Sequence, residues 1–230
     1  MKIAAVIPAR YDSSRFPGKP LVQIDGKPMI EHVYERVKKV ENVDEVVVAT
    51  DDKRIQKAVK NFEGNVEMTS SEHKSGTDRV AEVSSELDVD IIVNVQGDEP
   101  LIEPVMIEQA IKPLKNDKSI VMSTLKKKID NLNEINNPNV VKVITDKNNF
   151  ALYFSRSTIP YKREDSNLGV EYYKHIGLYV YKKDFLLKYS EMETTSLEKT
   201  ESLEQLRVLE NGYKIKVVET AFDTVGVDTP

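Results

Sequence analysis

The stretch IAAVIPARYDSSRFPGKP, residues 3–20, joins an apolar run to a loop that carries three cations. The run at residues 3–7 is short and rich in β-branched side chains, which is typical of a buried strand. Backbone N–H groups in a loop with glycine and proline can approach a phosphate closely. Arg10, Arg15 and Lys19 add the positive charge that a triphosphate needs in the ground state and the transition state. An isolated basic loop favours a solvated surface, but this string after a buried strand predicts a triphosphate-binding loop with three catalytic cations.

Outward from this strand, further β-branched runs alternate with stretches of helical periodicity. This alternation predicts an α/β fold with βαβ units around a doubly wound, mostly parallel sheet. Such sheets bind ligands at the carboxyl ends of their strands. The predicted strands are 46–49, 66–68 and 91–95, and the predicted helices are 29–40, 53–61 and 78–87.

The second half of the chain has a different pattern. Strand-like runs are separated mainly by loops, with one short helical stretch at 131–135. We therefore expect one domain over residues 1–230, with an antiparallel β insertion at about 130–185. The strand-like runs are 120–125, 140–145, 151–154, 176–181 and the weaker 213–220, and a further helix is predicted at 202–209.

Composition excludes several classes of function. The chain has 33 basic and 38 acidic residues and no cysteine, which excludes disulfides, thiolate metal sites and thiol catalysis. No basic face for nucleic acid is evident, because the three lysines at 126–128 are expected to be solvated surface. No apolar run approaches the roughly 20 residues that cross a bilayer. We expect a cytoplasmic protein without nucleic-acid or membrane partners.

Two further segments supply carboxylates. Residues 93–100, VNVQGDEP, take a buried strand into a turn, and residues 224–230, TVGVDTP, end another strand. Mg²⁺ is usually held by one or two carboxylates together with substrate phosphates. Ordinary turn chemistry would also explain each segment alone. Taken with the cationic loop, they predict a Mg²⁺ site on Asp98 and Asp228, with Glu99 a weaker candidate.

Two common nucleotide motifs do not occur in the sequence. It has no Gly-x-Gly-x-x-Gly fingerprint of dinucleotide-binding folds and no Gly-x-x-x-x-Gly-Lys-Ser/Thr loop. Dehydrogenase and P-loop functions are therefore disfavoured.

Taken together, strings along the whole chain resemble the 3-deoxy-manno-octulosonate (Kdo) cytidylyltransferase family, also called CMP-Kdo synthetases. They occur in the family's order, which makes the resemblance specific. The strings are PARYDSSRFPGKPL at 8–21, VATD at 48–51, HKSGTDR at 73–79, NVQGDEP at 94–100, YFSR at 153–156, LEQLR at 203–207 and GVDTP at 226–230.

The resemblance implies a nucleotide-diphospho-sugar transferase-like fold and a dimeric cytoplasmic enzyme. Such an enzyme uses CTP and Mg²⁺ to activate Kdo for lipopolysaccharide synthesis. Its antiparallel β insertion contributes to the sugar site and the dimer interface. By likeness, the nucleotide-binding positions are Ala9, Arg10, Lys19, Ser75, Gly76 and Gln96, and the metal-binding positions are Asp98 and Asp228. The sugar-binding positions are Arg156, His175, Tyr179, Glu204 and Gln205.

The sequence departs from the family at two places. Tyr161 stands where the family usually has tryptophan, and the sequence stops at Pro230 where the family usually continues into a helix. The implied reaction is in-line attack of the anomeric hydroxyl on the α-phosphorus of CTP, with Asp98 joining the cations as a catalytic residue. No general base is assigned. Activation of another acidic sugar, metal-dependent glycosyl transfer and a non-catalytic nucleotide sensor remain as alternatives. Pyrophosphate release would separate nucleotidyl transfer from glycosyl transfer, which releases a nucleoside phosphate.

Overall fold

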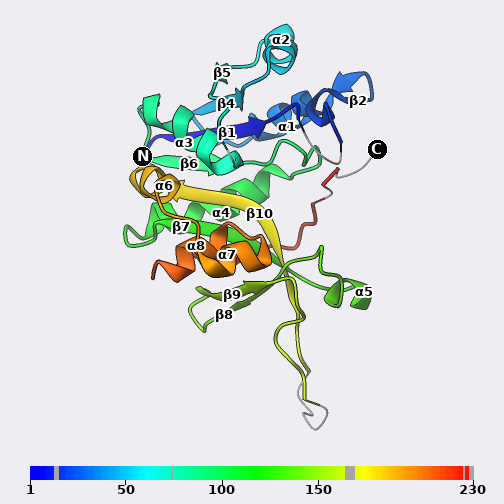
Figure 1. Ribbon diagram of the computed structural model, residues 1–230, viewed down its shortest axis with the longest axis vertical. Coiled ribbons are helices and arrows are strands. Elements are labelled where there is room, and N and C mark those ends of the chain that lie inside the picture. The colour runs from blue at the N-terminus through cyan, green and yellow to red at the C-terminus, as the bar shows by residue number, and fades with distance from the viewer. Residues whose placement is uncertain (13–15, 74, 164–168, 225, 228–230) are drawn as a thin grey trace.

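The computed structural model describes residues 1–12, 16–73, 75–163, 169–224 and 226–227 (Figure 1). A mixed sheet forms its centre, and most neighbouring pairs on the main path are parallel. The exception is the third strand of the spatial order given next, which runs antiparallel to both of its neighbours on that path. In spatial order the strands are β11 (Lys216–Glu219), β7 (Met122–Lys128), β10 (Tyr173–Lys182), β6 (Ile91–Asn94), β1 (Ile3–Ala9), β4 (Glu45–Thr50) and β5 (Val66–Met68), and β10 is the antiparallel one.

Helices cover both faces of this sheet. Alternate side chains of β1 show why, because Ile3 and Ile7 enter one buried cluster while Ala4 and Val6 enter another. The first cluster includes side chains of α1 (Met29–Val37), α2 (Lys53–Asn61) and α4 (Pro104–Asn116), and the second includes those of α3 (Gly76–Glu86), α6 (Lys183–Ser190) and α8 (Gln205–Glu210). The predicted doubly wound α/β fold is confirmed.

The loops predicted between the strand-like runs of residues 120–181, with one short helix near 131–135, are confirmed, but three helices outside that span were not predicted. α4 precedes β7, and α6 and α7 (Ser196–Glu201) follow β10. In α4, Pro104 occupies the first turn, where its missing N–H breaks no helical hydrogen bond. Before α7, the Glu198 carboxylate accepts the Thr195 N–H at 3.2 Å, which is the glutamate half of a capping box. Both start signals are present in the sequence.

The antiparallel insertion is a hairpin of β8 (Lys142–Thr145) and β9 (Ala151–Ser155). The hairpin leaves the main path of the sheet and contacts it where β8 pairs with β10 (Figure 1). The short helix α5 (Leu132–Ile135) precedes it. The strand-like runs at 120–125 and 176–181 belong instead to the central sheet as β7 and β10.

A register shift interrupts the pairing of β10 with β7. Ile176 is paired with Leu125 and Tyr179 with Thr124, so β10 holds two more residues than β7 over this step. The Thr124 hydroxyl lies 3.1 Å from the Ile176 carbonyl oxygen and 2.8 Å from that of Leu178. The hydroxyl therefore lies within hydrogen-bonding distance of two backbone carbonyls at the point where the extra residues interrupt the regular strand pairing.

The three lysines at 126–128 are not a uniformly solvated surface, which corrects the sequence interpretation. Lys126 is 6% exposed, and its ammonium lies 4.2 Å from the centroid of the Tyr173 ring. Lys127 pairs with Asp223 at 3.0 Å, and only Lys128 is half-exposed. Burial of this part of β7 against β10 and β11 is the physical reason. Among the described residues, no helix is both long and apolar enough to cross a bilayer.

Candidate active site

The loop after β1 closes on itself through Gly18. Gly18 has a φ of 74°, and its N–H donates to the Tyr11 carbonyl at 2.8 Å. A Cβ added there would lie 3.1 Å from the Tyr11 ring, so both the backbone angle and the close ring favour glycine. The Arg54 guanidinium lies 3.2 Å from the centroid of the same ring. Arg10 is exposed at the start of the loop, and the predicted catalytic residue Arg15 lies outside the described residues.

Lys19 and Asp98 meet at the carboxyl ends of β1 and β6. These strands are parallel neighbours, so the loops that follow them start at the same edge of the sheet. A Cβ on Gly97 would lie 2.8 Å from the Pro8 carbonyl oxygen, so glycine lets the second loop approach the end of β1. Lys19 Nζ then lies 2.6 Å from Asp98 Oδ2, in a half-buried ion pair. Ala9, the last residue of β1, is buried.

Glu99 is a second carboxyl group at this edge. Burial, followed by the neighbouring charge of Asp98, raises the pKa of Glu99 to about 7, against an opposing hydrogen bond from Thr224. A second negative charge is therefore disfavoured here, and a divalent cation would relieve that cost with oxygen ligands of the kind Mg²⁺ prefers. The donor chemistry fits Mg²⁺. The backbone N–H of Val227 donates to the Asp98 carbonyl at 3.0 Å, whereas Asp228 lies outside the described residues.

No group of three or more His, Asp or Glu side chains arranged to hold a metal occurs in the part of the chain that the structure describes. A metal at Asp98 would therefore need further oxygens from substrate, from water or from residues beyond that part.

The amino end of α3 lies beside the same edge. Ser75 caps the helix, because its hydroxyl accepts the Asp78 N–H at 3.1 Å while the Asp78 carboxylate accepts the Ser75 N–H at 3.2 Å. A Cβ on Gly76 would lie 3.5 Å from the Pro8 ring, which places this helix end next to β1. The unpaired N–H groups and dipole of a helix start favour anions. Ser75 and Gly76 thus lie near Lys19 and Asp98, at one edge of the sheet.

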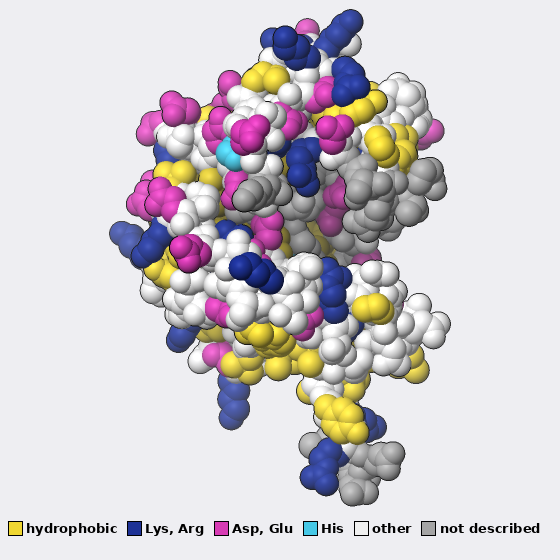
Figure 2. All heavy atoms as spheres, in the orientation of Figure 1, with side chains coloured by type: hydrophobic (Ala, Val, Ile, Leu, Met, Phe, Trp, Pro, Cys, Tyr) yellow, Lys and Arg dark blue, Asp and Glu magenta, His cyan; other side chains and the backbone are white. Residues whose placement is uncertain are grey.

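Two adjoining hollows lie between this edge and the second half of the chain, on the face shown in Figure 2. They have volumes of about 260 and 420 Å³ and share Gly177, Tyr179, Leu203 and Gln205 in their walls. The smaller is lined by Gly76, Gln96, Tyr179, Glu204 and Gln205, among others. The larger is lined by His175, Tyr179, Gln205, Asp223 and Thr224, among others. The structure therefore brings predicted nucleotide positions and predicted sugar positions into one continuous lining.

Hydrogen bonds orient the polar groups of the smaller hollow. The Tyr179 hydroxyl donates to Gln205 Oε1 at 3.2 Å, and the Thr77 hydroxyl donates to Glu204 Oε2 at 2.7 Å. Burial raises the pKa of Glu204 despite the Thr77 hydrogen bond, and burial also raises the pKa of Tyr179. Within the described residues, the buried Gln205 Nε2 has no hydrogen-bond partner. An unmet amide donor beside a hollow is suited to an oxygen-rich ligand.

His175 is held as a neutral ring in the larger hollow. Its Nε2 lies 2.9 Å from the Thr124 hydroxyl, and its ring packs edge-on to Phe154 at 4.9 Å between centroids. Burial lowers the pKa of His175 to about 3. The residue can therefore offer a hydrogen bond at neutral pH, but no charge.

Arg156 is the predicted sugar residue that lines neither hollow in the described structure. Its guanidinium donates to three backbone carbonyls, those of Glu201 at 2.7 Å, Pro138 at 3.0 Å and Ser202 at 3.4 Å. Ser202 itself belongs to the lining of the smaller hollow. Arg156 thus links the backbone at Pro138 to that at Glu201 and Ser202. Its contact with a sugar carboxylate stays a prediction.

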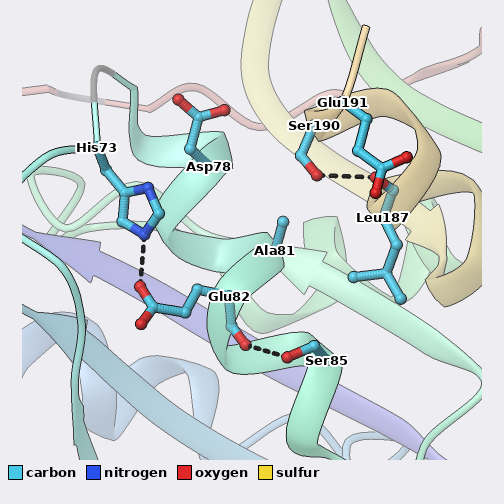
Figure 3. A pocket seen from close by; sticks show the side chains of 8 residues that line it. All are labelled: His73, Asp78, Ala81, Glu82, Ser85, Leu187, Ser190 and Glu191. Carbon is cyan, nitrogen blue, oxygen red and sulfur yellow. Dashed lines mark hydrogen bonds and ion pairs between the residues drawn. The ribbon is translucent and has the colours of Figure 1, made fainter.

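A third hollow, of about 470 Å³, lies between α3 and α6 (Figure 3). Glu82 contacts the His73 ring and accepts the Ser70 N–H at 3.0 Å, so it ties the loop before Ser75 to α3. Asp78, Glu82 and Glu191 make this lining acidic. Its charge is unsuited to a triphosphate, and its contacts support the loop that ends at the α3 cap.

Sequence reasoning missed several residues of this region. Thr77 had a signal, because it lies inside the SGTDR string, but it was not singled out. Thr224 likewise lies inside the TVGVDTP string without having been singled out. Thr124 had no signal, since it contacts His175 only through the pairing of β7 with β10.

Comparison with known proteins places this geometry among nucleotidyltransferases. Residues 4–215 match the family model described as cytidylyltransferase. The chain is 59% identical, over 100% of its own length and 95% of the relative, to 3-deoxy-manno-octulosonate cytidylyltransferase of Geotalea uraniireducens (strain Rf4). It is 56% identical to the enzyme of that name from Fusobacterium nucleatum subsp. nucleatum, over 100% and 93% of the two chains.

Solved structures agree. One, of CMP:2-keto-3-deoxy-manno-octonic acid synthetase complexed with CTP, has a TM-score of 0.95 and 47% identity, covering 100% of this chain and 94% of the other. Another, of a putative glucose-1-phosphate thymidylyltransferase from Bacillus anthracis, has a TM-score of 0.68 and 16% identity over 99% and 90%, and shows the shared fold alone. The protein described here belongs to the cytidylyltransferase family, among the 3-deoxy-manno-octulosonate cytidylyltransferases.

Proposed function

We propose that the protein transfers CMP from CTP to the anomeric hydroxyl of Kdo and releases pyrophosphate, activating the sugar for lipopolysaccharide synthesis. The observation that carries the proposal is the full-length identity of 59% to a relative named for this reaction. The half-buried pair of Lys19 and Asp98 at the edge of the sheet supports it chemically.

CTP would occupy the edge formed by the loop after β1 and the amino end of α3. Lys19, Arg10 and Arg15 would draw charge toward the departing pyrophosphate, and Ser75, Gly76 and Gln96 would lie along the nucleotide. Phosphoryl transfer offers a protein little covalent chemistry, so positioning and charge stabilisation would dominate.

Asp98 and Asp228 are the residues that we propose to hold Mg²⁺. When bound, the ion would supply neutralisation of phosphate charge at this edge. The raised pKa of Glu99 supports the proposal, because it reports that this site disfavours another uncompensated negative charge.

The sugar would enter the two hollows beside β10 and α8. Tyr179, Glu204, Gln205 and neutral His175 supply hydrogen bonds for hydroxyl groups, and the unpaired Gln205 Nε2 is a donor still to be used. Arg156 remains the proposed partner of the sugar carboxylate.

A homodimer and a cytoplasmic location complete the proposal. Leu152 of the hairpin is 60% exposed and Tyr161 is 84% exposed. An exposed apolar area of this kind fits a protein interface. Light scattering after size-exclusion chromatography tests it, because a monomer mass would reject the dimer.

One experiment tests the reaction. The protein is incubated with Mg²⁺, each nucleoside triphosphate in turn, and a panel of acidic sugars that includes Kdo, sialic acid and an amino analogue of Kdo. We expect pyrophosphate to form with CTP and Kdo. Pyrophosphate with a different acidic sugar would reassign the substrate, and release of a nucleoside phosphate from a nucleotide sugar would reject the reaction.

A further inference from the structure

Two lysines lie opposite each other on neighbouring antiparallel strands. The register pairs Lys127 of β7 with Lys174 of β10. Like charges placed directly opposite across a sheet destabilise it. The repulsion is poorly screened because the two side chains are only 18% and 15% exposed. This point of the sheet therefore favours the docking of negative charge.

Asp223 supplies that charge from the chain that follows β11. Its Oδ2 lies 3.0 Å from Lys127 Nζ, and its Oδ1 lies 3.0 Å from Lys174 Nζ. Glu134 of α5 also pairs with Lys174 at 3.0 Å. Burial opposes ionisation of Asp223, but the hydrogen bonds from Lys174 and Lys127 outweigh it and lower its pKa. A charged carboxylate thus binds both strands at once.

The same stretch of chain continues to the proposed metal site. Thr224 follows Asp223 and hydrogen-bonds the Glu99 carboxyl. Val227, four residues after Asp223, donates its N–H to the Asp98 carbonyl at 3.0 Å. Asp223, Thr224 and Gly226 all line the larger hollow. The ion pairs therefore lie at one end of a short segment whose other end contacts the loop that bears Asp98.

We propose that Asp223, held by Lys127 and Lys174, is a positioning residue. It docks the segment that follows β11 against the loop that bears Asp98. The proposal rests on the proposed function, in which residue 228, next after Val227, binds the metal. Asp223 touches no reacting atom in this scheme. It sets where the segment lies, and so affects how well the enzyme takes up Mg²⁺ rather than how well it binds CTP.

The test compares three full-length variants with the wild type. Asp223→Asn removes the charge, Asp223→Glu restores it, and Asp130→Asn removes an exposed carboxylate outside these ion pairs as a matched control. Backbone hydrogen exchange of the peptide covering 220–227 reports docking without any turnover. Asp223→Asn should exchange about tenfold faster there, because two charge-assisted bonds are lost. Asp223→Glu should recover much of the protection, and Asp130→Asn should match the wild type.

The second measurement is the Mg²⁺ concentration that gives half-maximal CMP transfer. It should rise several-fold in Asp223→Asn and fall back in Asp223→Glu, while the calorimetric affinity for CTP without sugar stays within about twofold. Unchanged exchange in Asp223→Asn would overturn the proposal, and so would faster exchange with unchanged Mg²⁺ dependence. If the wild type transfers no CMP, the proposed function fails, and the exchange measurement alone still decides whether Asp223 docks the segment.

A fourth variant guards against a general loss of folding. Lys127→Met removes one of the opposed charges and leaves Lys174 to hold Asp223, so exchange at 220–227 should lie between wild type and Asp223→Asn. Exchange equal to that of Asp223→Asn, with β6 peptides also faster, would show loosening of the sheet and reject a local docking role.

Discussion

Two parts of the candidate site are organised in opposite ways. One is the edge of the sheet where β1 and β6 end, and the other is the wall formed by β10, α8 and the segment that follows β11. The edge is local, because the loop directly after β1 carries Lys19 and the turn directly after β6 carries Asp98. The wall gathers side chains from distant positions, such as His175, Glu204 and Asp223. Charge chemistry is thus encoded in short strings of sequence, whereas the proposed sugar-binding wall depends on tertiary packing.

Asp98→Asn should break the edge most severely. It removes the partner of Lys19 and a proposed metal ligand from a polar site, so turnover should fall by about a hundredfold to a thousandfold. Thermal unfolding should stay close to that of the wild type. Turnover near the wild-type level at limiting Mg²⁺ would show that Asp98 binds no metal.

Lys19→Ala should have the next largest effect. A cation that assists departure of pyrophosphate matters most in the transition state, so kcat should fall by about a hundredfold. CTP affinity, measured by calorimetry, should change much less. A raised KM with unchanged kcat would assign Lys19 to binding alone.

Arg156→Ala tests the wall. Loss of a charge-assisted partner costs about 1.5–3 kcal/mol, so KM for the sugar should rise while CTP affinity is nearly unchanged. Because Arg156 also holds three backbone carbonyls, Arg156→Lys is the matched variant that keeps the charge. Equal loss of CTP and sugar binding would show that Arg156 acts on the fold instead.

The smallest effects concern pH, and they have opposite signs in the two regions. The pKa of His175 is lowered from 6.5 to about 3, so the unfolded state binds more protons and the free energy of unfolding should fall as pH drops from 6.5 toward 3. The pKa of Glu99 is raised from 4.5 to about 7, so its contribution is present below pH 4.5 and is lost as pH rises through 7.

Urea unfolding from pH 4.5 to 7.5, with EDTA present, separates these contributions. His175→Gln should flatten the acid loss of stability, and Glu99→Gln should remove the loss on the alkaline side. Parallel curves for wild type and both variants would contradict the two shifted pKa values.

Much of the first half of the fold follows from sequence. The runs at 53–61 and 66–68 correspond to α2 and β5 without a change of bounds, and in α2 the buried Ile55 and Val59 recur at helical spacing. The buried side chains of α4 recur at helical spacing, but the helix was not predicted. Its two prolines, Pro104 and Pro113, are residues that favour loops. The lysines at 126–128 were misjudged because the identity of their partners, Tyr173 and Asp223, depends on strand pairing.

The candidate site divides in the same way. Lys19 and Asp98 stand in recognisable strings, and the parallel pairing of β1 and β6 brings them together. Tyr179 and Gln205 were predicted only from the family resemblance. Their hydrogen bond joins a strand and a helix through residues that are 26 positions apart in the sequence. Asp223 had no signal of its own, since its importance arises only when two lysines oppose each other in register.

The register shift in β10 has a consequence for the history of the family. The two extra residues of β10 require the Thr124 hydroxyl, which serves the Ile176 and Leu178 carbonyls and also contacts His175. An insertion in one strand and a hydroxyl in another should therefore be inherited together. Relatives that keep the longer strand should retain serine or threonine opposite it, and those with an unbroken ladder should be free to replace it by valine.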